Sequence, residues 1–248
     1  MNRLIIWMKL LWWYLRSLNC NHKAKLLSAE ETVEEVCNRS CSLIRLGDGE
    51  LNCLNGLDVH YQAADNALKQ ELKQVIDYYI KNSQTCEYLL CMPNEFLKCS
   101  GITLARKRVW VSSWARFRYV FKKYFDLKIR YGDAFVFAKG YNDQYKKIWM
   151  KADNIIFVHN NEKFAKKFKE EYKKVVCYIE IPERDCYSNI DFIVERIKYE
   201  ISVRKNEGST MVLISAGPCG KVIVFRLKNV GVQVIDTGHC WDDPLHTR

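Results

Sequence analysis

Two carboxylates, two residues apart, directly follow a short apolar run. Asp48 and Glu50 lie in the segment Arg45-Leu-Gly-Asp-Gly-Glu, with Gly47 and Gly49 on either side of Asp48. Carboxylates that turn toward one side of a loop can share a Mg²⁺ or Mn²⁺ ion, whose open positions then accept diphosphate oxygens. Arg45 adds a planar cation for phosphate or carboxylate. Asp-Gly is also ordinary turn chemistry, so the spacing predicts a metal site without excluding a plain turn.

A second candidate site lies near the C-terminus, where an apolar run passes through a glycine-containing turn into a helical pattern. Gly217, Pro218 and Gly220 form this turn, and Lys221 follows it. Backbone N–H groups at the start of a helix suit an anion such as phosphate. The spacing is not that of a Walker A loop. A tight strand-to-helix turn without a ligand explains the pattern equally well.

A third candidate is the polar turn Asp236-Thr-Gly-His239, which also follows an apolar run. An acid and a histidine three residues apart could hold a metal ion, bind a sugar hydroxyl or carry a proton. A hydrogen-bonded structural histidine is the simpler alternative. The position after a strand keeps Asp236 and His239 as candidates.

All three groups depend on strands that alternate with helices. Strands are predicted at 41–46, 86–92, 134–139, 154–159, 174–181, 210–216 and 232–236. Helices are predicted at 29–39, opened by a Ser28 to Glu31 capping box, and at 63–81, 103–125, 142–151, 162–173, 188–205 and 219–229. The strands read as continuous apolar runs, which favours a doubly wound, Rossmann-like, mostly parallel α/β sheet covered on both faces. Ligands of such sheets bind beyond the carboxyl ends of the strands.

In these motifs the chain resembles the bacterial glycosyltransferases of the GT-D fold. The resemblance runs in order over about 41–240 and is most specific in the R-x-G-D-G-E segment and in the G-P, helix, strand, D-x-G-H segment. It implies an enzyme of hexosyltransferase type on a Rossmann-like scaffold. Such an enzyme would use Mn²⁺ or Mg²⁺ and a nucleotide-sugar donor, with a UDP-sugar expected. The acceptor would be a glycan, a lipid-diphosphate-linked sugar or a glycoprotein in surface polysaccharide or glycoprotein assembly.

The resemblance also assigns residues. The metal motif falls on Asp48 and Glu50, with Arg45 and Gly47 beside it, and the donor-binding turn falls on Gly217, Pro218 and Gly220. An inverting reaction needs a base for the acceptor hydroxyl, and the candidates near predicted strand ends are Asp236, His239 and Glu180. The chain departs from the family at Cys219-Gly-Lys221 and at His159-Asn-Asn-Glu162. The donor specificity of the family is therefore not assigned to this chain.

Two further function classes stay open beside the transferase. A two-carboxylate turn also suits a metal-dependent phosphohydrolase. A non-catalytic membrane-surface binding protein would need Asp48-Gly-Glu50 only as a turn.

The net charge of +10 is concentrated in two segments. Residues 1–29 carry five basic side chains and no acidic one, and residues 98–130 carry ten basic side chains against Asp126 alone, which leaves the remainder acidic at −4. Nucleic-acid binding would need the charge along a recognisable binding face, so no nucleic-acid partner is expected.

The first segment predicts an amphipathic helix on an anionic membrane surface. Lys9 interrupts the apolar run, which excludes a signal peptide and a membrane span. Arg3, Lys9 and Arg16 share one helical face, and several tryptophans accompany them. The predicted organisation is this helix and its connector over 1–27, then one domain over 28–248. Packing of the helix on the protein's own core or on a partner subunit is the alternative.

The basic segment 103–125 is either a solvated face or a contact with the membrane or with acceptor phosphates. The eleven cysteines show no metal-binding spacing and are expected to be reduced, buried and cytosolic. We therefore expect a cytoplasmic protein, peripheral at the inner face of the cell membrane.

Overall fold

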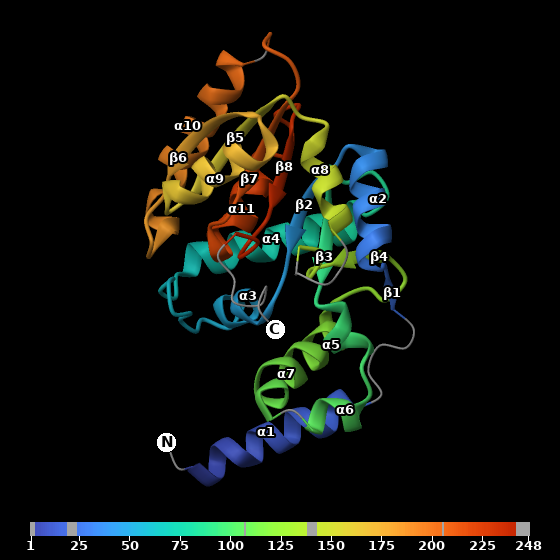
Figure 1. Ribbon diagram of the computed structural model, residues 1–248. Coiled ribbons are helices and arrows are strands. Elements are labelled where there is room, and N and C mark those ends of the chain that lie inside the picture. Colours follow the sequence, from blue (N-terminus) through green and yellow to red (C-terminus); the bar gives the residue numbers. More distant parts are fainter. Residues whose placement is uncertain (1–2, 19–23, 107, 138–142, 205, 242–248) are drawn as a thin grey trace.

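A computed structural model describes residues 3–18, 24–106, 108–137, 143–204 and 206–241 (Figure 1). It contains one eight-stranded sheet in which every strand pairing is parallel, in the order β1-β4-β3-β2-β8-β7-β5-β6. The predicted doubly wound α/β class is confirmed. The strands are β1 (Lys25–Leu26), β2 (Ser42–Arg45), β3 (Tyr88–Met92), β4 (Arg130–Asp133), β5 (Asn154–His159), β6 (Val175–Glu180), β7 (Thr210–Ile214) and β8 (Gln233–Asp236).

Helices cover both faces of the sheet and one of its ends. They are α1 (Arg3–Ser17), α2 (Ala29–Arg39), α3 (Asp48–Leu54), α4 (Asn66–Asn82), α5 (Asn94–Lys98), α6 (Gly101–Arg106), α7 (Arg108–Tyr124), α8 (Lys147–Met150), α9 (Glu162–Tyr172), α10 (Ile190–Val203) and α11 (Gly217–Arg226), with short 3₁₀ turns at Asp143–Lys146 and Cys186–Asn189. α4, α10 and α11 pack together on one face. The right-handed crossover rule puts α2 and α9 on the other face.

The chain changes direction across the sheet at its centre. From β2 it proceeds through β3 to β4 on one side, then crosses to β5 and β6 at the far edge and returns through β7 to β8, which pairs with β2. The two halves of the sheet meet at the junction of β2 and β8, and we call this junction the switch point. Parallel α/β sheets bind ligands beyond the carboxyl ends of their strands.

Helices α5, α6, α7 and α1 lie together beyond the end of the sheet at which β2 and β3 finish (Figure 1). α7 contacts α3 and α5, and α1 packs along α7. The predicted helix at 103–125 is thus two helices, α6 and α7. Helix α1 contacts the body of the protein, so the predicted regions 1–27 and 28–248 share an interface.

One predicted strand was placed wrongly. Residues 134–139 were predicted as a strand, but β4 is Arg130–Asp133 and residues 134–137 form a turn. The N–H of Phe135 donates to the Asp133 carboxylate at 2.9 Å, and the N–H of Val136 donates to the Asp133 carbonyl at 3.3 Å. This turn ends the strand before the apolar residues that suggested it. Residues 138–139, the rest of the prediction, lie outside the described residues, as do 107, 142 and 205 of the predicted helices.

Candidate active site

The Asp48-Gly-Glu50 segment is the start of a helix. The sequence suggested a turn, but α3 begins at Asp48 with Gly47 as its N-cap residue. The Gly47 N–H donates to Glu50 Oε2 at 2.7 Å, so Glu50 closes the first turn as the acid of a capping box does. Carboxylates are favoured there because the helix N-terminus is electropositive. Asp48 and Glu50 both line a cavity, but Asp48 is half-buried and Glu50 is buried.

A lysine that sequence reasoning left without a role lies beneath this helix. Lys221, on α11, is only 4% exposed. Its Nζ lies 3.2 Å from Glu50 Oε1 and 3.0 Å from Asp236 Oδ2. Burial alone lowers the pKa of the Lys221 ammonium, but the carboxylates of Asp236 and Glu50 outweigh it and raise the pKa above its usual value. Lys221 is therefore a fixed cation that links two of the predicted motifs.

Asp236 ties the ends of β2 and β8 together. Besides its contact with Lys221, its Oδ2 accepts a hydrogen bond from the Arg45 N–H at 3.0 Å. The carboxylate is fully buried, and its Oδ1 has no hydrogen-bond partner among the described residues. Asp236 does not line the cavity. Its geometry suits a residue that positions Lys221 and Arg45 better than one that receives a proton from an acceptor.

Arg45 holds a fixed orientation at the cavity wall. Its Nη1 donates to the Ala134 carbonyl at 2.8 Å, and its guanidinium lies over the Phe137 ring, 5.5 Å from the centroid. Gly238, with a φ of +52°, lies so close to the guanidinium that a Cβ there would overlap it. The glycine of the Asp236-x-Gly-His239 motif is therefore needed both for its backbone conformation and to leave room for Arg45.

The glycine-proline turn opens α11 toward the same cavity. α11 begins at Gly217, which lines the cavity with a φ of +53°, and the ring of Tyr61 lies where a Cβ of Gly217 would be. Pro218 and Gly220 are buried in the first turn and do not line the cavity. The backbone, not their side chains, is what this turn can present to an anion.

The three predicted bases have different positions. His239 is exposed and lines the cavity, with its ring edge-to-face against Tyr61 at 6.2 Å between centroids. Asp236 is buried beneath the cavity, as described above. Glu180 is exposed at the end of β6, the edge strand, and does not line the cavity. His239 is the only one of the three candidates that lines it.

The cavity has a volume of about 440 Å³ and lies at the carboxyl ends of β2, β5, β7 and β8. The loop of His60, Tyr61 and Gln62 forms one wall and is tied to the segment after β6: the Asp185 N–H donates to the Tyr61 carbonyl at 2.9 Å. Burial, followed by the charge of Glu50, raises the pKa of Tyr61 to about 12, so its hydroxyl stays neutral. Trp114, Phe135 and Phe137 add aromatic side chains to the cavity lining.

Several cavity residues were not among the predicted site residues. His159 ends β5 and is buried at the cavity, so the strand-end rule that selected Asp236 could have selected it. Glu183 follows β6 by three residues. Tyr61 and Trp114 belong to a loop and a helix outside the strand-end motifs, and no sequence signal marks them.

Asp48 and Glu50 could hold a divalent metal ion only if water or substrate supplied its remaining ligands. Over the described ranges, no group of three or more His, Cys, Asp or Glu side chains lies close enough together to hold a metal ion. Mg²⁺ often takes just one or two carboxylates and completes its shell with water and substrate phosphate. Asp48 and Glu50 both line the cavity, so this pair fits that kind of site.

Comparison with known proteins gives one consistent group. The family model described as "Glycosyltransferase GT-D fold" matches residues 43–243. Among curated proteins, "Glycosyltransferase GlyD" of Streptococcus pneumoniae serotype 4 is 24% identical over 85% of this chain and 26% of its own length. "Probable glycosyl transferase Gly" of Streptococcus gordonii is 22% identical over 86% and 32%, respectively. The chain thus spans about a quarter to a third of the length of these relatives.

Two solved structures have the same fold. The structure titled "The highly conserved domain of unknown function 1792 has a distinct glycosyltransferase fold" superposes with a TM-score of 0.72 at 20% identity, covering 92% of this chain and 81% of that one. "A New Glycosyltransferase (DUF1792) from Streptococcus sanguinis" superposes with a TM-score of 0.67 at 21% identity, covering 88% and 82%.

Proposed function

The chain belongs to the glycosyltransferase GT-D fold family, and on that premise we propose that it transfers a sugar from a nucleotide-sugar donor, a UDP-sugar, to an acceptor hydroxyl. One observation carries the proposal. Arg45, Asp48, Glu50 and Lys221 converge with the start of α11 at the switch point between β2 and β8, beside a cavity large enough for a ligand.

The proposed chemistry is the departure of a nucleoside diphosphate from the sugar. Negative charge builds on the leaving phosphate, and groups fixed in place before the reaction stabilise it most effectively. Arg45 is held by Ala134 and Phe137, and Lys221 by Glu50 and Asp236. Gly217, the first residue of α11, lines the cavity, so the N-terminus of this helix adjoins it. These groups would bind and orient the diphosphate end of the donor.

We propose that Asp48 and Glu50 hold a Mn²⁺ or Mg²⁺ ion together with the donor diphosphate. When bound, the ion would act as a Lewis acid on the phosphate oxygens. Asp48, which is the more exposed of the two, would contribute one ligand from the cavity wall. Glu50 would contribute the other while its Oε1 stays paired with Lys221.

On the acceptor side we propose His239 as the base, if the reaction inverts. Its imidazole lines the cavity and can take the proton of an acceptor hydroxyl placed there. Asp236 and Glu180 are not used in this proposal, because neither lines the cavity.

The acceptor is proposed to be a glycan, a lipid-diphosphate-linked sugar or a glycoprotein in bacterial surface polysaccharide or glycoprotein assembly. The proposed location is cytoplasmic, at the inner face of the cell membrane. In support, all ten cysteines among the described residues are free, as expected in a reducing compartment; Cys20 lies outside them. None of the described helices is long and apolar enough to cross a bilayer.

A thermal-shift panel tests the donor assignment. A ligand that binds only the folded protein raises its melting temperature in proportion to RT ln(1 + [L]/Kd). We expect UDP and UDP-sugars to raise it, and to do so more strongly with Mn²⁺ or Mg²⁺ present. No shift with any nucleoside diphosphate, with or without the metal ions, would contradict the proposal and favour a non-catalytic binding protein. Turnover of generic phosphoesters without an acceptor would favour a phosphohydrolase.

Asp48→Asn tests the carboxylate at the cavity. We expect transfer to fall by about a hundredfold or more while the melting temperature of the unliganded protein stays close to that of the wild type, because Asp48 is partly exposed. Glu162→Gln is the matched control, since Glu162 is also an acid in the first turn of a helix but lies outside the cavity. Wild-type activity of Asp48→Asn with Mn²⁺ or Mg²⁺ present would remove Asp48 from the mechanism, and full activity with metal ions chelated would remove the metal ion.

A further inference from the structure

Helix α1 is fixed to the body of the protein along one face. The Trp13 ring packs edge-to-face on Tyr119 of α7 at 4.8 Å between centroids, and the Arg116 guanidinium lies 5.9 Å from the Trp13 ring centroid. The Tyr14 hydroxyl donates to the Gly101 carbonyl at 3.0 Å, which joins α1 to the start of α6. This inner face of α1 therefore packs on the protein itself, as the predicted alternative has it.

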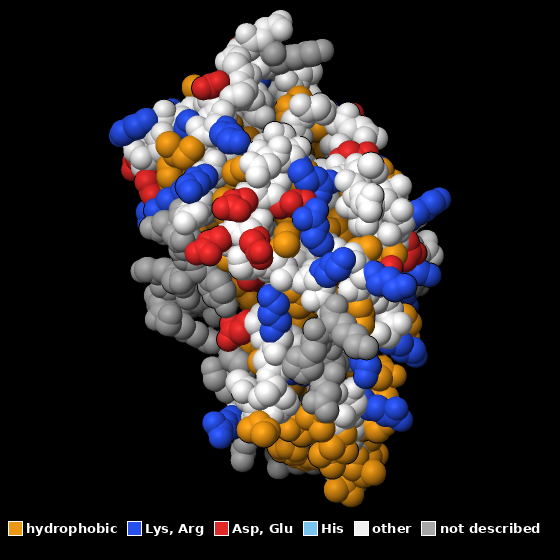
Figure 2. Space-filling view, turned by 90° about the vertical axis from the view of Figure 1, so that its right-hand side faces the viewer, with side chains coloured by type: hydrophobic (Ala, Val, Ile, Leu, Met, Phe, Trp, Pro, Cys, Tyr) orange, Lys and Arg blue, Asp and Glu red, His pale blue; other side chains and the backbone are white. Residues whose placement is uncertain are grey.

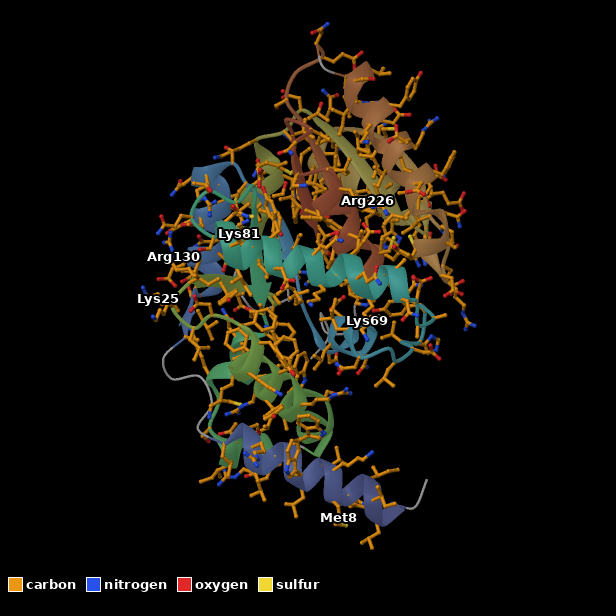
Figure 3. The ribbon with its side chains drawn as sticks, turned by 180° about the vertical axis from the view of Figure 1, so that it is seen from behind. Met8, Lys25, Lys69, Lys81, Arg130 and Arg226 are labelled. Carbon is orange, nitrogen blue, oxygen red and sulfur yellow. The ribbon has the colours of Figure 1, made fainter. Side chains whose placement is uncertain are left out.

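The outer face of α1 is apolar and exposed. Met8 is 62% exposed and Leu15 is 55% exposed, and Met8 lies on the side of α1 away from the sheet (Figure 3). The other large apolar side chains exposed on α1 and α6 are Leu4, Ile5, Ile6, Trp7, Leu11, Trp12 and Ile102. Figure 2 shows hydrophobic side chains gathered at this end of the molecule. So dense a patch on a protein surface marks an interaction site.

Positive charge surrounds the patch. The sequence has no acidic residue in 1–29 or in 98–125, the stretches that form α1, α6 and α7. Lys9 and Arg16 on α1, and Arg106, Lys122 and Lys123 on α6 and α7, are exposed. A second copy of the same surface would bring these cations against one another. An anionic lipid surface complements both the charge and the apolar face.

We propose that α1, α6 and α7 form a docking layer for an anionic bilayer. The outer face of α1 lies in the boundary between headgroups and acyl chains, where tryptophan side chains are favoured. Lys9, Arg16 and the cations of α6 and α7 contact the lipid phosphates around it. The chain binds on the membrane surface through this layer.

The docking layer lies next to the cavity. α7 carries Trp114, which lines the cavity and stacks on Phe96 at 4.2 Å between ring centroids. α7 also contacts α3, which carries Asp48 and Glu50. The carboxyl ends of β2 and β3 point toward this layer (Figure 1). The bound protein therefore holds its cavity between the sheet and the membrane.

Co-sedimentation with vesicles tests the docking layer. The probes are vesicles of phosphatidylcholine alone and of phosphatidylcholine with phosphatidylglycerol. We expect the full chain to bind the anionic vesicles, to bind them more weakly at 0.5 M salt, and to bind neutral vesicles least. Met8→Glu/Leu15→Glu should weaken binding at least about tenfold, because two inserted apolar side chains are replaced by charges that the lipid repels.

Phe192→Glu/Tyr199→Glu on α10 is the matched control: Phe192 and Tyr199 are also exposed apolar residues seven positions apart on one helix. This control should bind anionic vesicles like the wild type. A second measurement on the unmodified chain is quenching of tryptophan fluorescence by brominated lipid, which should occur in anionic vesicles.

Three outcomes would overturn the proposal. They are absence of binding to anionic vesicles, equal binding by the α1 variant and the wild type, and self-association of the full chain that is abolished by Met8→Glu/Leu15→Glu while vesicle binding is not. The experiment uses no nucleotide, so its result is independent of the transferase proposal, which the thermal-shift panel tests separately.

Discussion

The switch point of the sheet and the docking layer both contain several charged residues, but the two regions differ in how far those charges are buried and paired. At the switch point, Glu50, Asp236 and Lys221 are buried, and Lys221 lies within salt-bridge distance of both carboxylates. In the docking layer Lys9, Arg16, Arg106, Lys122 and Lys123 are exposed, and the stretches that form the layer contain no acidic residue. Buried charge must be balanced inside the fold, whereas exposed charge can be left for a partner.

The comparison teaches how each region can be recognised. A buried, ion-paired cluster keeps its geometry before a ligand arrives, which suits transition-state stabilisation. An exposed, unbalanced layer gains its full interaction energy only against an oppositely charged surface, and salt weakens it. The predictions below separate these two behaviours.

Lys221→Met gives the largest expected effect. It keeps the volume of the side chain but leaves the Glu50 and Asp236 carboxylates buried without their shared cation, so the free energy of unfolding should fall by about 3–5 kcal/mol. Denaturant unfolding measures this. Lys166→Met, which removes an exposed ion pair with Glu162, is the control and should cost less than about 0.5 kcal/mol. Similar losses of stability in both variants would contradict the role of Lys221 as the buried cation shared by Glu50 and Asp236.

Asp133 gives a smaller effect that depends on pH. Asp133 is a buried carboxylate at the end of β4 and has no salt bridge among the described residues; burial raises its pKa to about 6. The folded state therefore binds more protons than the unfolded state between pH 3.8 and about 6, and the free energy of unfolding falls as pH rises through that window, by up to about 3 kcal/mol.

Asp133→Asn removes this titration and keeps an acceptor oxygen for the Phe135 N–H. Its free energy of unfolding should therefore decline less than that of the wild type between pH 4 and pH 7, as measured by denaturant unfolding at each pH. Identical pH profiles of the two proteins would show that the Asp133 carboxyl is not the group that loses its proton there.

Lys9→Ser/Arg16→Ser gives the smallest effect on folding. Both side chains are exposed on α1, so the free energy of unfolding should stay within about 0.5 kcal/mol of the wild type. Binding to anionic vesicles should weaken by about 1 kcal/mol for each lost charge. Lys163→Ser/Lys167→Ser on α9 removes two exposed cations elsewhere and should leave vesicle binding unchanged. Equal loss in both variants would mean that net charge, and not the docking layer, drives binding.

Elements whose boundaries depend on local signals could be predicted from the sequence. β5 is Asn154–His159 and α2 is Ala29–Arg39, as the apolar run and the Ser28 capping box predicted. β4 could not be placed, because Asp133 forms a turn that stops the strand before the apolar residues 134–137. α3 was missed for a related reason: Asp-Gly-Glu is common in turns, and Glu50 makes it a helix start by accepting the Gly47 N–H.

The sequence by itself determined the α/β class, most of the strands and longer helices, the motifs at the strand ends and the segments that carry the positive charge. These follow from hydrophobic periodicity, capping residues and composition, which are local properties. Only the tertiary structure decided that Lys221 joins Glu50 to Asp236, that Asp236 is buried while His239 lines the cavity, and that α1 packs on α7 with its apolar face outward. Those facts depend on contacts between residues as many as 191 positions apart, as in the hydrogen bond from Arg45 to Asp236, and no local pattern encodes which side chains meet when a parallel sheet closes.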